Sequence, residues 1–237
     1  MHTMDTTIST VRKMVTAGAA MACLFAMPAA NATFLTSDTL TAPTLVDFSQ
    51  FTGGGQIINA NGPVQVGGLV GEDIEYTGVP NNGLYAWNGG WSLVANGFWG
   101  SGRDGYLGQN NARPGDMFLT FNSGPVSAVG AFMNYCPDCG SGDDLIITAY
   151  DAAMAVLESY NVTLLADIVT PGGDDAGAFR GISRAQADIH AFGIYGHVQV
   201  IDDLVFERAA VPEPVTLLLL GVGLLGIGSA RRRCHDA

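Results

Sequence analysis

The chain has 237 residues, of which 48% are hydrophobic and only 14% charged, and its 22 acidic side chains outnumber ten Lys and Arg to give a formal charge of −12. High hydrophobicity with low charge excludes an intrinsically disordered acidic protein. The negative charge also excludes nucleic acid as a partner, because phosphate binding requires clustered basic residues.

The first 32 residues predict a secretory signal peptide. The basic pair Arg12-Lys13 precedes an apolar stretch over residues 14–29. Ala30-Asn31-Ala32 then supplies the small residues that signal peptidase accepts, so we expect cleavage immediately before Thr33. The alternative is a buried N-terminal helix, which does not explain this three-part order. The sequence therefore predicts export, with signal peptidase as the first processing partner.

Residues 33–210 predict a single all-β domain. Short apolar or alternating runs are separated by clusters of Gly, Asn and Asp, a pattern typical of a β-sandwich or jelly roll. The predicted strands are 44–48, 117–121, 126–135, 145–150, 156–165, 178–182, 189–195 and 198–206. Within 126–135 the alternation places four side chains on one face of the strand: Val129, Ala131, Met133 and Tyr135.

Several connections between these strands are also predicted. A turn at 113–116 is expected to precede strand 117–121, and residues 151–154 and 196–197 are expected to form hairpin turns. A helical turn over 157–165 is the alternative to strand 156–165. The β-branched and aromatic side chains in that run favour a strand.

The predicted domain is more acidic than the whole chain. It holds five arginines, no lysine and 19 acidic residues, a formal charge of −14. This charge favours solubility and repels anionic surfaces. No G-x-S-x-G elbow is present, and the glycine runs lack the lysine of a phosphate loop. We therefore predict no catalytic residues and no enzyme; a secreted hydrolase that uses two carboxylates is the least favoured alternative.

The Gly- and Asn-rich segment 53–111 contains all three tryptophans, Trp87, Trp91 and Trp99. Aromatic rings next to amide side chains suit sugar binding, because sugar C–H faces pack on rings while amides bind hydroxyl groups. The three tryptophans are thus a candidate ligand platform of a carbohydrate-binding module. The alternative is that they fill the core of the sandwich, where large aromatic residues usually lie.

Only Cys136 and Cys139 lie outside the two terminal segments. In an exported protein a disulfide between them is the expected state, and it would pin one tight turn. Redox chemistry and zinc binding are the alternatives, but neither a βαβ pattern nor a second ligand pair accompanies this C-x-x-C.

Acidic pairs recur in the predicted loops. Asp138, Asp143 and Asp144 offer several oxygens within one turn, as calcium sites in exported sandwiches do. Their spacing is not that of an EF-hand loop, and solvated loop carboxylates are the alternative. Calcium is therefore the one cofactor that the sequence suggests, at a weakly specified site.

The C-terminal 27 residues have a second three-part order. Pro212-Glu213-Pro214 is followed by an apolar run over 215–230 and then by Arg231, Arg232 and Arg233. As a helix the run would cover about 24 Å, which is short of a ~30 Å hydrocarbon core. A single membrane helix is expected, inserted transiently, and the arginines are expected to stay cytoplasmic. A plain tail anchor is the alternative.

This tail resembles the PEP-CTERM protein-sorting signal, which is also catalogued as a C-terminal domain of ice-binding proteins. The resemblance implies a Gram-negative bacterium that makes exopolysaccharide, a candidate partner. It also implies processing near Pro-Glu-Pro by an exosortase, a membrane-embedded cysteine protease-transpeptidase. The protein would be anchored in the inner membrane before processing and would then reach the cell surface or extracellular matrix.

The domain between the two signals resembles extracellular lectin-like sandwiches that often precede this tail. The resemblance rests on an early strand with Val46-Asp47-Phe48, a middle hairpin over 147–153 and a closing strand over 201–206. The favoured hypothesis is a non-catalytic exported protein of the cell surface or matrix. A secreted carbohydrate-binding module is the second hypothesis.

Overall fold

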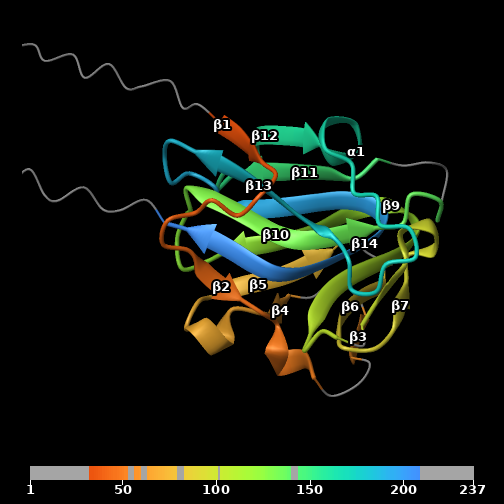
Figure 1. Ribbon diagram of the computed structural model, residues 1–237. Helices are drawn as coiled ribbons and strands as arrows, with labels where there is room; N and C mark the ends of the chain where they lie inside the picture. Colours follow the sequence, from red (N-terminus) through yellow and green to blue (C-terminus); the bar gives the residue numbers. More distant parts are fainter. Residues whose placement is uncertain are drawn as a thin grey trace, which may run out of the picture.

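The computed structural model describes residues 32–52, 56–59, 63–78, 83–100, 102–139 and 144–208. The predicted signal peptide, except its last residue, and the predicted sorting tail lie outside these residues. Within them the chain is mostly β-structure with antiparallel strand pairing (Figure 1). The predicted all-β fold, consistent with a β-sandwich, is confirmed.

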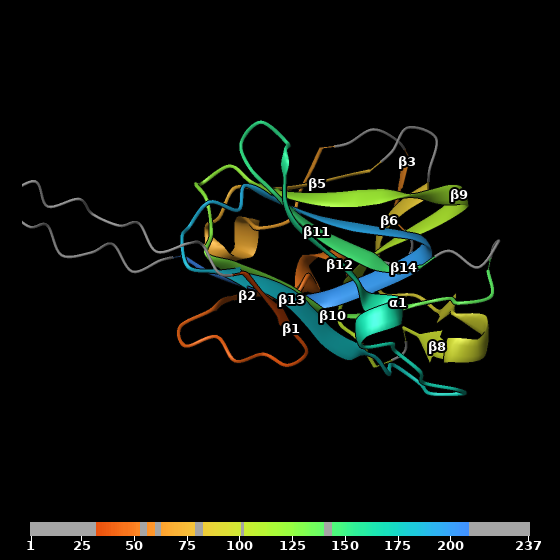
Figure 2. The same cartoon turned by 90° about the horizontal axis from the view of Figure 1, so that it is seen from above.

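Two long strands, β9 (Tyr106–Phe121) and β14 (Ala191–Glu207), pair antiparallel to each other along most of their length. The register between them shifts between Gly196 and Val198, where β14 bends. The first half of β14 pairs with β11 (Ile146–Tyr150) and the second half with β10 (Ala128–Tyr135). Because of the bend, β14 passes from one layer of the sandwich to the other (Figure 2).

Each layer is built outward from this central pair. The first layer contains, in order, β12 (Val156–Asn161), β11, the first half of β14, the second half of β9, β5 (Ile74–Gly78) and β4 (Val64–Gln65). The second layer contains β1 (Ala32–Leu35), β13 (Ala178–Arg184), β10, the second half of β14, the first half of β9, β6 (Gly83–Trp87) and β3 (Gln56–Asn59). β9 begins at Tyr106, and beyond this point β2 (Thr44–Val46) pairs with the last residues of β14 instead.

The remaining elements are short. They are the 3-10 turns η1 (Ser49–Phe51), η2 (Gly68–Val70) and η3 (Val94–Asn96), the helical turn α1 (Val162–Leu165), and a separate two-stranded sheet of β7 (Trp91–Ser92) and β8 (Phe98–Trp99). No helix among the described residues has the length and hydrophobicity needed to cross a membrane.

The main core lies between the two layers and consists of aliphatic, Phe, Tyr and Met side chains. The four side chains that are predicted to share one face of β10 all belong to this core: Val129, Ala131, Met133 and Tyr135. At about 25 cal/mol per Å² of buried apolar surface, this core supplies most of the driving force for folding.

A second, smaller core lies on the outer face of the second layer. The segment 88–104, which carries β7, η3 and β8, covers this face (Figure 2). It buries Trp91, Leu93 and Trp99 against Tyr106 of β9 and against Val198 and Val200 of β14. We refer to residues 88–104 below as the covering segment.

Two predicted turns are wrong. Residues 196–197 lie inside β14 rather than in a hairpin, and residues 113–116 lie inside β9. The ladder between these strands passes from Asn110–Val198 to Gly115–Gly196 and skips residues 111–114. A proline is tolerated in this stretch because its missing N–H is not needed for the ladder.

The predicted strand 156–165 is correct only in its first part. β12 ends at Asn161, whose side-chain oxygen accepts a hydrogen bond from the backbone N–H of Leu164 at 3.0 Å. This cap starts the helical turn α1. The predicted hairpin at 151–154 is present, since β11 and β12 pair antiparallel across it.

The first and last strands of the described chain have their outer termini at the same end of the second layer. Thr33 of β1 pairs with Ser183 of β13, Ser183 pairs with Ala128 of β10, and Ala128 pairs with Glu207 of β14. Cleavage before Thr33 would therefore leave a mature N-terminus inside β1, three strands from the exit of the chain.

Candidate functional site

The sequence Trp87-Asn88-Gly89-Gly90-Trp91 forms the connection from β6 to β7. A side chain at Gly89 would overlap the indole of Trp87, and one at Gly90 would overlap the ring of Phe98. Both glycines are therefore required for the close packing of this turn. The Asn88 side chain donates a hydrogen bond to the carbonyl of Thr52 at 3.0 Å. The turn brings the Trp87 and Trp91 rings to 6.3 Å between centroids.

A surface hollow of about 390 Å³ opens beside this turn. Tyr85 and Trp87 project from the same face of β6, two residues apart, and are half-buried. Trp91 is only 6% exposed, and its ring meets the Tyr85 ring edge to face at 4.6 Å. The remaining lining residues are Gly90, Ser92 and Asn110. We refer to this hollow as the aromatic pocket.

Trp99 does not line the aromatic pocket. It is fully buried in the second core, stacks on Phe132 with ring centroids 5.9 Å apart, and its indole N–H donates to the carbonyl of Ala176. The structure thus divides the three tryptophans of the predicted platform. Trp87 and Trp91 line the pocket, whereas Trp99 anchors the covering segment. None of the three belongs to the main core between the layers.

A second hollow, of about 280 Å³, lies near the same covering segment and is acidic. Its lining residues are Asp47, Gly102, Arg103, Asp104, Asp175, Asp202 and Asp203. The bulge in β14 creates it: Asp203 has a positive φ of 48°, and the β10–β14 register shifts at this point. β9 and β2 leave a gap beside β14 here, since they pair with Ile201 and Leu204 respectively.

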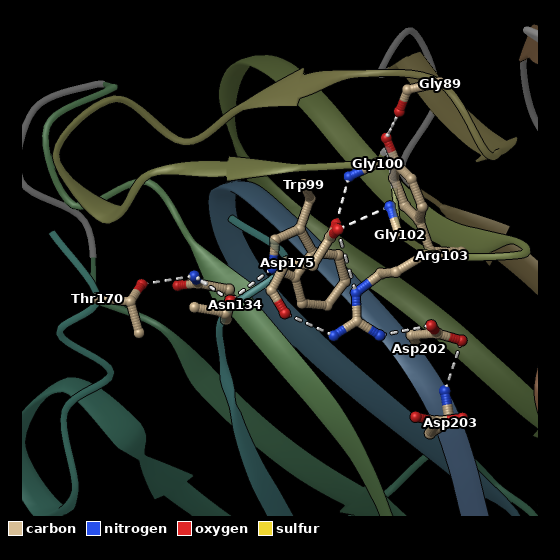
Figure 3. Close-up of polar contacts among 12 residues, drawn as sticks. Gly89, Trp99, Gly100, Gly102, Arg103, Asn134, Thr170, Asp175, Asp202 and Asp203 are labelled. Carbon is tan, nitrogen blue, oxygen red and sulfur yellow. Dashed lines mark hydrogen bonds and ion pairs between the residues drawn. The ribbon is translucent and has the colours of Figure 1, made fainter. Parts of the chain in front are cut away.

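Arg103 occupies the centre of this acidic hollow. Its guanidinium lies 4.1 Å from the centroid of the Trp99 ring and donates to the carboxylate of Asp202 at 2.6 Å. It also donates to the backbone carbonyl of Asp175 at 2.9 Å, as Figure 3 shows. The Asp175 carboxylate in turn accepts from the backbone N–H groups of Gly100 and Gly102. The arginine thereby links the covering segment to β14.

Asp202 is 5% exposed, and burial raises the pKa of its carboxyl to about 6 despite the opposing hydrogen bond from Arg103. Both of its oxygens have partners, because Oδ2 accepts from Arg103 and Oδ1 accepts from the backbone N–H of Asp203 at 2.7 Å. Sequence reasoning interpreted acidic pairs as loop carboxylates, and the bulge that turns Asp202 inward had no sequence signal. The arrangement is that of a structural anchor.

A buried amide network completes the attachment of the covering segment. Asn96 of η3 donates to the side chain of Asn134 at 3.2 Å and to the carbonyls of Tyr135 and Ile168. Asn134 donates to the hydroxyl of Thr170 at 2.9 Å (Figure 3). Buried amides are stabilising only when they are paired in this way. An Asn in a glycine-rich segment gave no indication of burial.

The remaining predicted site residues are placed as follows. Cys136 and Cys139 form a disulfide with Cα atoms 5.4 Å apart, against the second core. Asp143 lies outside the described residues, and the carboxylate of Asp144 accepts a hydrogen bond from Asn161. Among the described residues, no three His, Cys, Asp or Glu side chains converge on a metal-sized site. Calcium at Asp138 and its neighbours therefore stays a prediction.

The predicted processing sites lie at the limits of the described chain. Ala30 falls outside it, whereas Ala32 and Thr33 are the first residues of β1. The sorting residues Pro212 to Pro214 and the three arginines at 231–233 lie outside it as well.

The family model of the PEP-CTERM protein-sorting motif matches residues 210–233. No curated protein matches the chain. The matched residues include Pro-Glu-Pro, the apolar run and the arginines, so the resemblance on which the prediction rested is confirmed. The chain is thus a β-rich domain followed by a PEP-CTERM protein-sorting motif, which implies export, membrane-associated sorting and an exosortase as processing partner.

Proposed function

We propose that the protein is a non-catalytic component of the cell surface or extracellular matrix, delivered by a signal peptide and processed by an exosortase. The observation that carries this proposal is the sorting motif at residues 210–233. The motif begins three residues after β14 ends at Glu207. The apolar run starts at residue 215, eight residues after Glu207, which would hold the domain close to the membrane before processing.

The chemistry of the acidic hollow supports the non-catalytic part of this proposal. A hydrolase acid would need a carboxyl with a raised pKa that is free to exchange its proton with substrate. Asp202 has the raised pKa, but both of its oxygens are engaged by Arg103 and by the Asp203 backbone. Its geometry supports a structural role.

Intact-mass measurement tests the sorting proposal. The full chain is expressed in a bacterium with an active exosortase and in a matched strain whose exosortase lacks its catalytic cysteine. We expect the surface-released protein from the first strain to begin at Thr33 and to end near Pro212. In the second strain the tail should be retained and the protein should fractionate with the inner membrane. Release with an intact tail from the active strain would contradict the proposal.

A pair of variants makes this test specific to the motif. Replacing Pro212, Glu213 and Pro214 together by alanine should block processing in the active strain. Asp236→Asn, a change of one acidic residue beyond the arginines, should leave processing unaltered. If both variants are processed like the natural chain, the Pro-Glu-Pro segment is not what the exosortase recognises.

A further inference from the structure

We propose that the aromatic pocket lined by Tyr85, Trp87 and Trp91 binds a neutral pyranose unit of a polysaccharide. This inference does not depend on the exosortase route, because it rests only on the geometry of the described domain. The pocket volume of about 390 Å³ lies within the range of roughly 300–1,000 Å³ that is typical of small-molecule sites.

The aromatic walls supply the apolar part of such a site. The faces of aromatic rings carry partial negative charge and the C–H groups of a pyranose carry partial positive charge, so the two attract each other when stacked. Trp87 and Tyr85 stand 6.4 Å apart between centroids, and the Trp91 ring lies across both. Trp87 is only half-buried, which leaves part of its ring open to a ligand.

The polar groups at the pocket are neutral and suit hydroxyl groups. The amide of Asn110 is exposed and can both donate and accept. The hydroxyl of Ser92 accepts from the backbone N–H of Val94 at 3.3 Å and keeps its own proton available for donation. A carboxylate or phosphate on the ligand would find no charged partner among the lining residues.

The four arginines whose side chains the structure describes do not change this conclusion. Every arginine whose side chain the structure describes is already engaged: Arg103 with Asp202, Arg180 with the carbonyl of Ala166, Arg184 with Asp188, and Arg208 with Glu72. Nucleic-acid bases also stack on aromatic rings, but their phosphates need free basic groups. Neutral sugars are the ligand class that combines ring stacking with uncharged hydrogen bonding.

The pocket is held in shape before any ligand arrives. Gly89 packs against the Trp87 indole, and the Trp91 ring lies on the backbone of Gly108 in β9. The hydroxyl of Tyr106 donates to the carbonyl of Gly89 at 2.6 Å, fixing the turn from below. A preformed site loses little conformational freedom on binding, which favours affinity.

The pocket also lies away from the ends of the domain. Asn110 pairs with Val198 of β14, nine residues before the last strand residue Glu207. At about 3.3 Å per residue, this places the pocket roughly 20–30 Å from the end of the second layer where β1 begins and β14 ends. A protein held through its C-terminal tail would therefore present the pocket outward.

Affinity electrophoresis of the full exported protein tests the proposal. The probes are soluble glucans, galactans and mannans, with alginate and polygalacturonate as uronic acid polymers and single-stranded DNA as a further polyanion. We expect retardation by at least one neutral polysaccharide and by none of the polyanions. Retardation by no neutral polysaccharide, or by the polyanions alone, would overturn the proposal.

Substitutions test whether the polysaccharide binds in the aromatic pocket. Trp87→Ala should weaken binding by about tenfold or more, and Asn110→Ala by about two- to tenfold. The matched control is Phe118→Ala, which removes a half-buried ring that meets Tyr150 edge to face at 5.7 Å in the other layer. Its binding should stay within about twofold of the natural chain, a change too small to represent a lost stacking contact.

Asn110→Ala keeps the test valid if Trp87→Ala proves poorly folded, because the Asn110 side chain is exposed and outside both cores. Folding of each variant is checked by circular dichroism. Undiminished binding in a folded Asn110→Ala and Trp87→Ala pair would place the sugar elsewhere and overturn the assignment. Weakened binding in Phe118→Ala to the same extent would do so too.

Discussion

The two cores of this protein are built from different chemistry. The main core between the layers is assembled from aliphatic residues, Phe, Tyr and Met, contributed by alternate positions of long strands. The second core, under the covering segment, contains Trp91, Trp99 and a disulfide cysteine. Buried amide side chains and Arg103 surround it. The first core makes the fold. The second attaches one segment to the outside of a finished sheet, and the aromatic pocket opens at its margin.

This difference implies different responses to mutation. Phe192→Ala in the main core should lower the free energy of unfolding by about 3–5 kcal/mol, because a buried ring is lost from a packed interior. Trp99→Ala removes a larger ring, yet it should cost less in global unfolding. We expect the covering segment to open while both layers stay folded, so that the effect is limited by the free energy with which this segment docks.

Urea denaturation and native-state hydrogen exchange measure the two effects. In Trp99→Ala we expect loss of amide protection confined to residues 88–104, with β10 and β14 still protected. Phe192→Ala should weaken protection across both layers. Equal loss of protection throughout the domain in both variants would show that the two cores unfold as one.

The ion pair between Arg103 and Asp202 should make the stability of the second core, unlike that of the main core, depend on pH. Because burial raises the folded-state pKa of Asp202 to about 6, the folded protein binds this proton more tightly than the unfolded chain. The contribution of this group to stability is therefore present below its unfolded pKa of about 4 and is lost as the pH rises through about 6. Docking of the covering segment should accordingly strengthen, not weaken, on mild acidification.

Asp202→Asn tests this sign. The amide cannot ionise, so the variant lacks this pH dependence. Its free energy of unfolding, relative to that of the natural chain, should rise by about 1–3 kcal/mol as the pH increases from about 4 to about 7. The measurement is the difference in the free energy of unfolding between the two proteins at each pH. A difference that does not change with pH, or that changes in the opposite direction, would contradict the expected shift.

Reduction of the Cys136–Cys139 disulfide is expected to have a modest effect on stability. The closed loop is only four residues long, so cross-linking it restricts the unfolded chain by about 2 kcal/mol in the loop-entropy model. The midpoint of thermal unfolding should fall modestly on addition of dithiothreitol, and a Cys136→Ala/Cys139→Ala variant should show no response to the reductant. A large collapse in stability would show that the second core supports the whole domain.

Periodicity accounts for what could be predicted from the sequence. The strands of the main core alternate apolar and small residues, so β10, β11 and β13 were located with the correct faces or near-correct limits. The three-part order of the C-terminal residues, through its resemblance to the PEP-CTERM signal, predicts the sorting motif equally well. The continuous course of β9 and β14 cannot be predicted in this way, because Pro114 and Gly196 are ordinary turn residues. Pro114 is accommodated because the ladder between the two strands skips residues 111–114, whereas Gly196 stays in the ladder, paired with Gly115.

The second core could not be predicted in this way. Its buried members come from the covering segment, from β9 and β14, and from Cys136 directly after β10, and no period connects them. Trp87, Trp91 and Trp99 were recognisable as a group, but their separation into two pocket residues and one buried anchor follows from the turn at Gly89 and Gly90. The burial of Asp202 depends on a bulge at Asp203, a residue that adopts positive φ without being glycine.

The course of β14 has a mechanical consequence for a protein tethered by its tail. Tension between a ligand held beside β6 and the C-terminal exit at Glu207 runs along the strand axis, because β6, the first half of β9 and the second half of β14 lie side by side. Load applied in that direction shears the ladder hydrogen bonds together rather than unzipping them one at a time. We therefore expect the geometry that places the proposed pocket far from the exit to make the connection between them resistant to pulling as well.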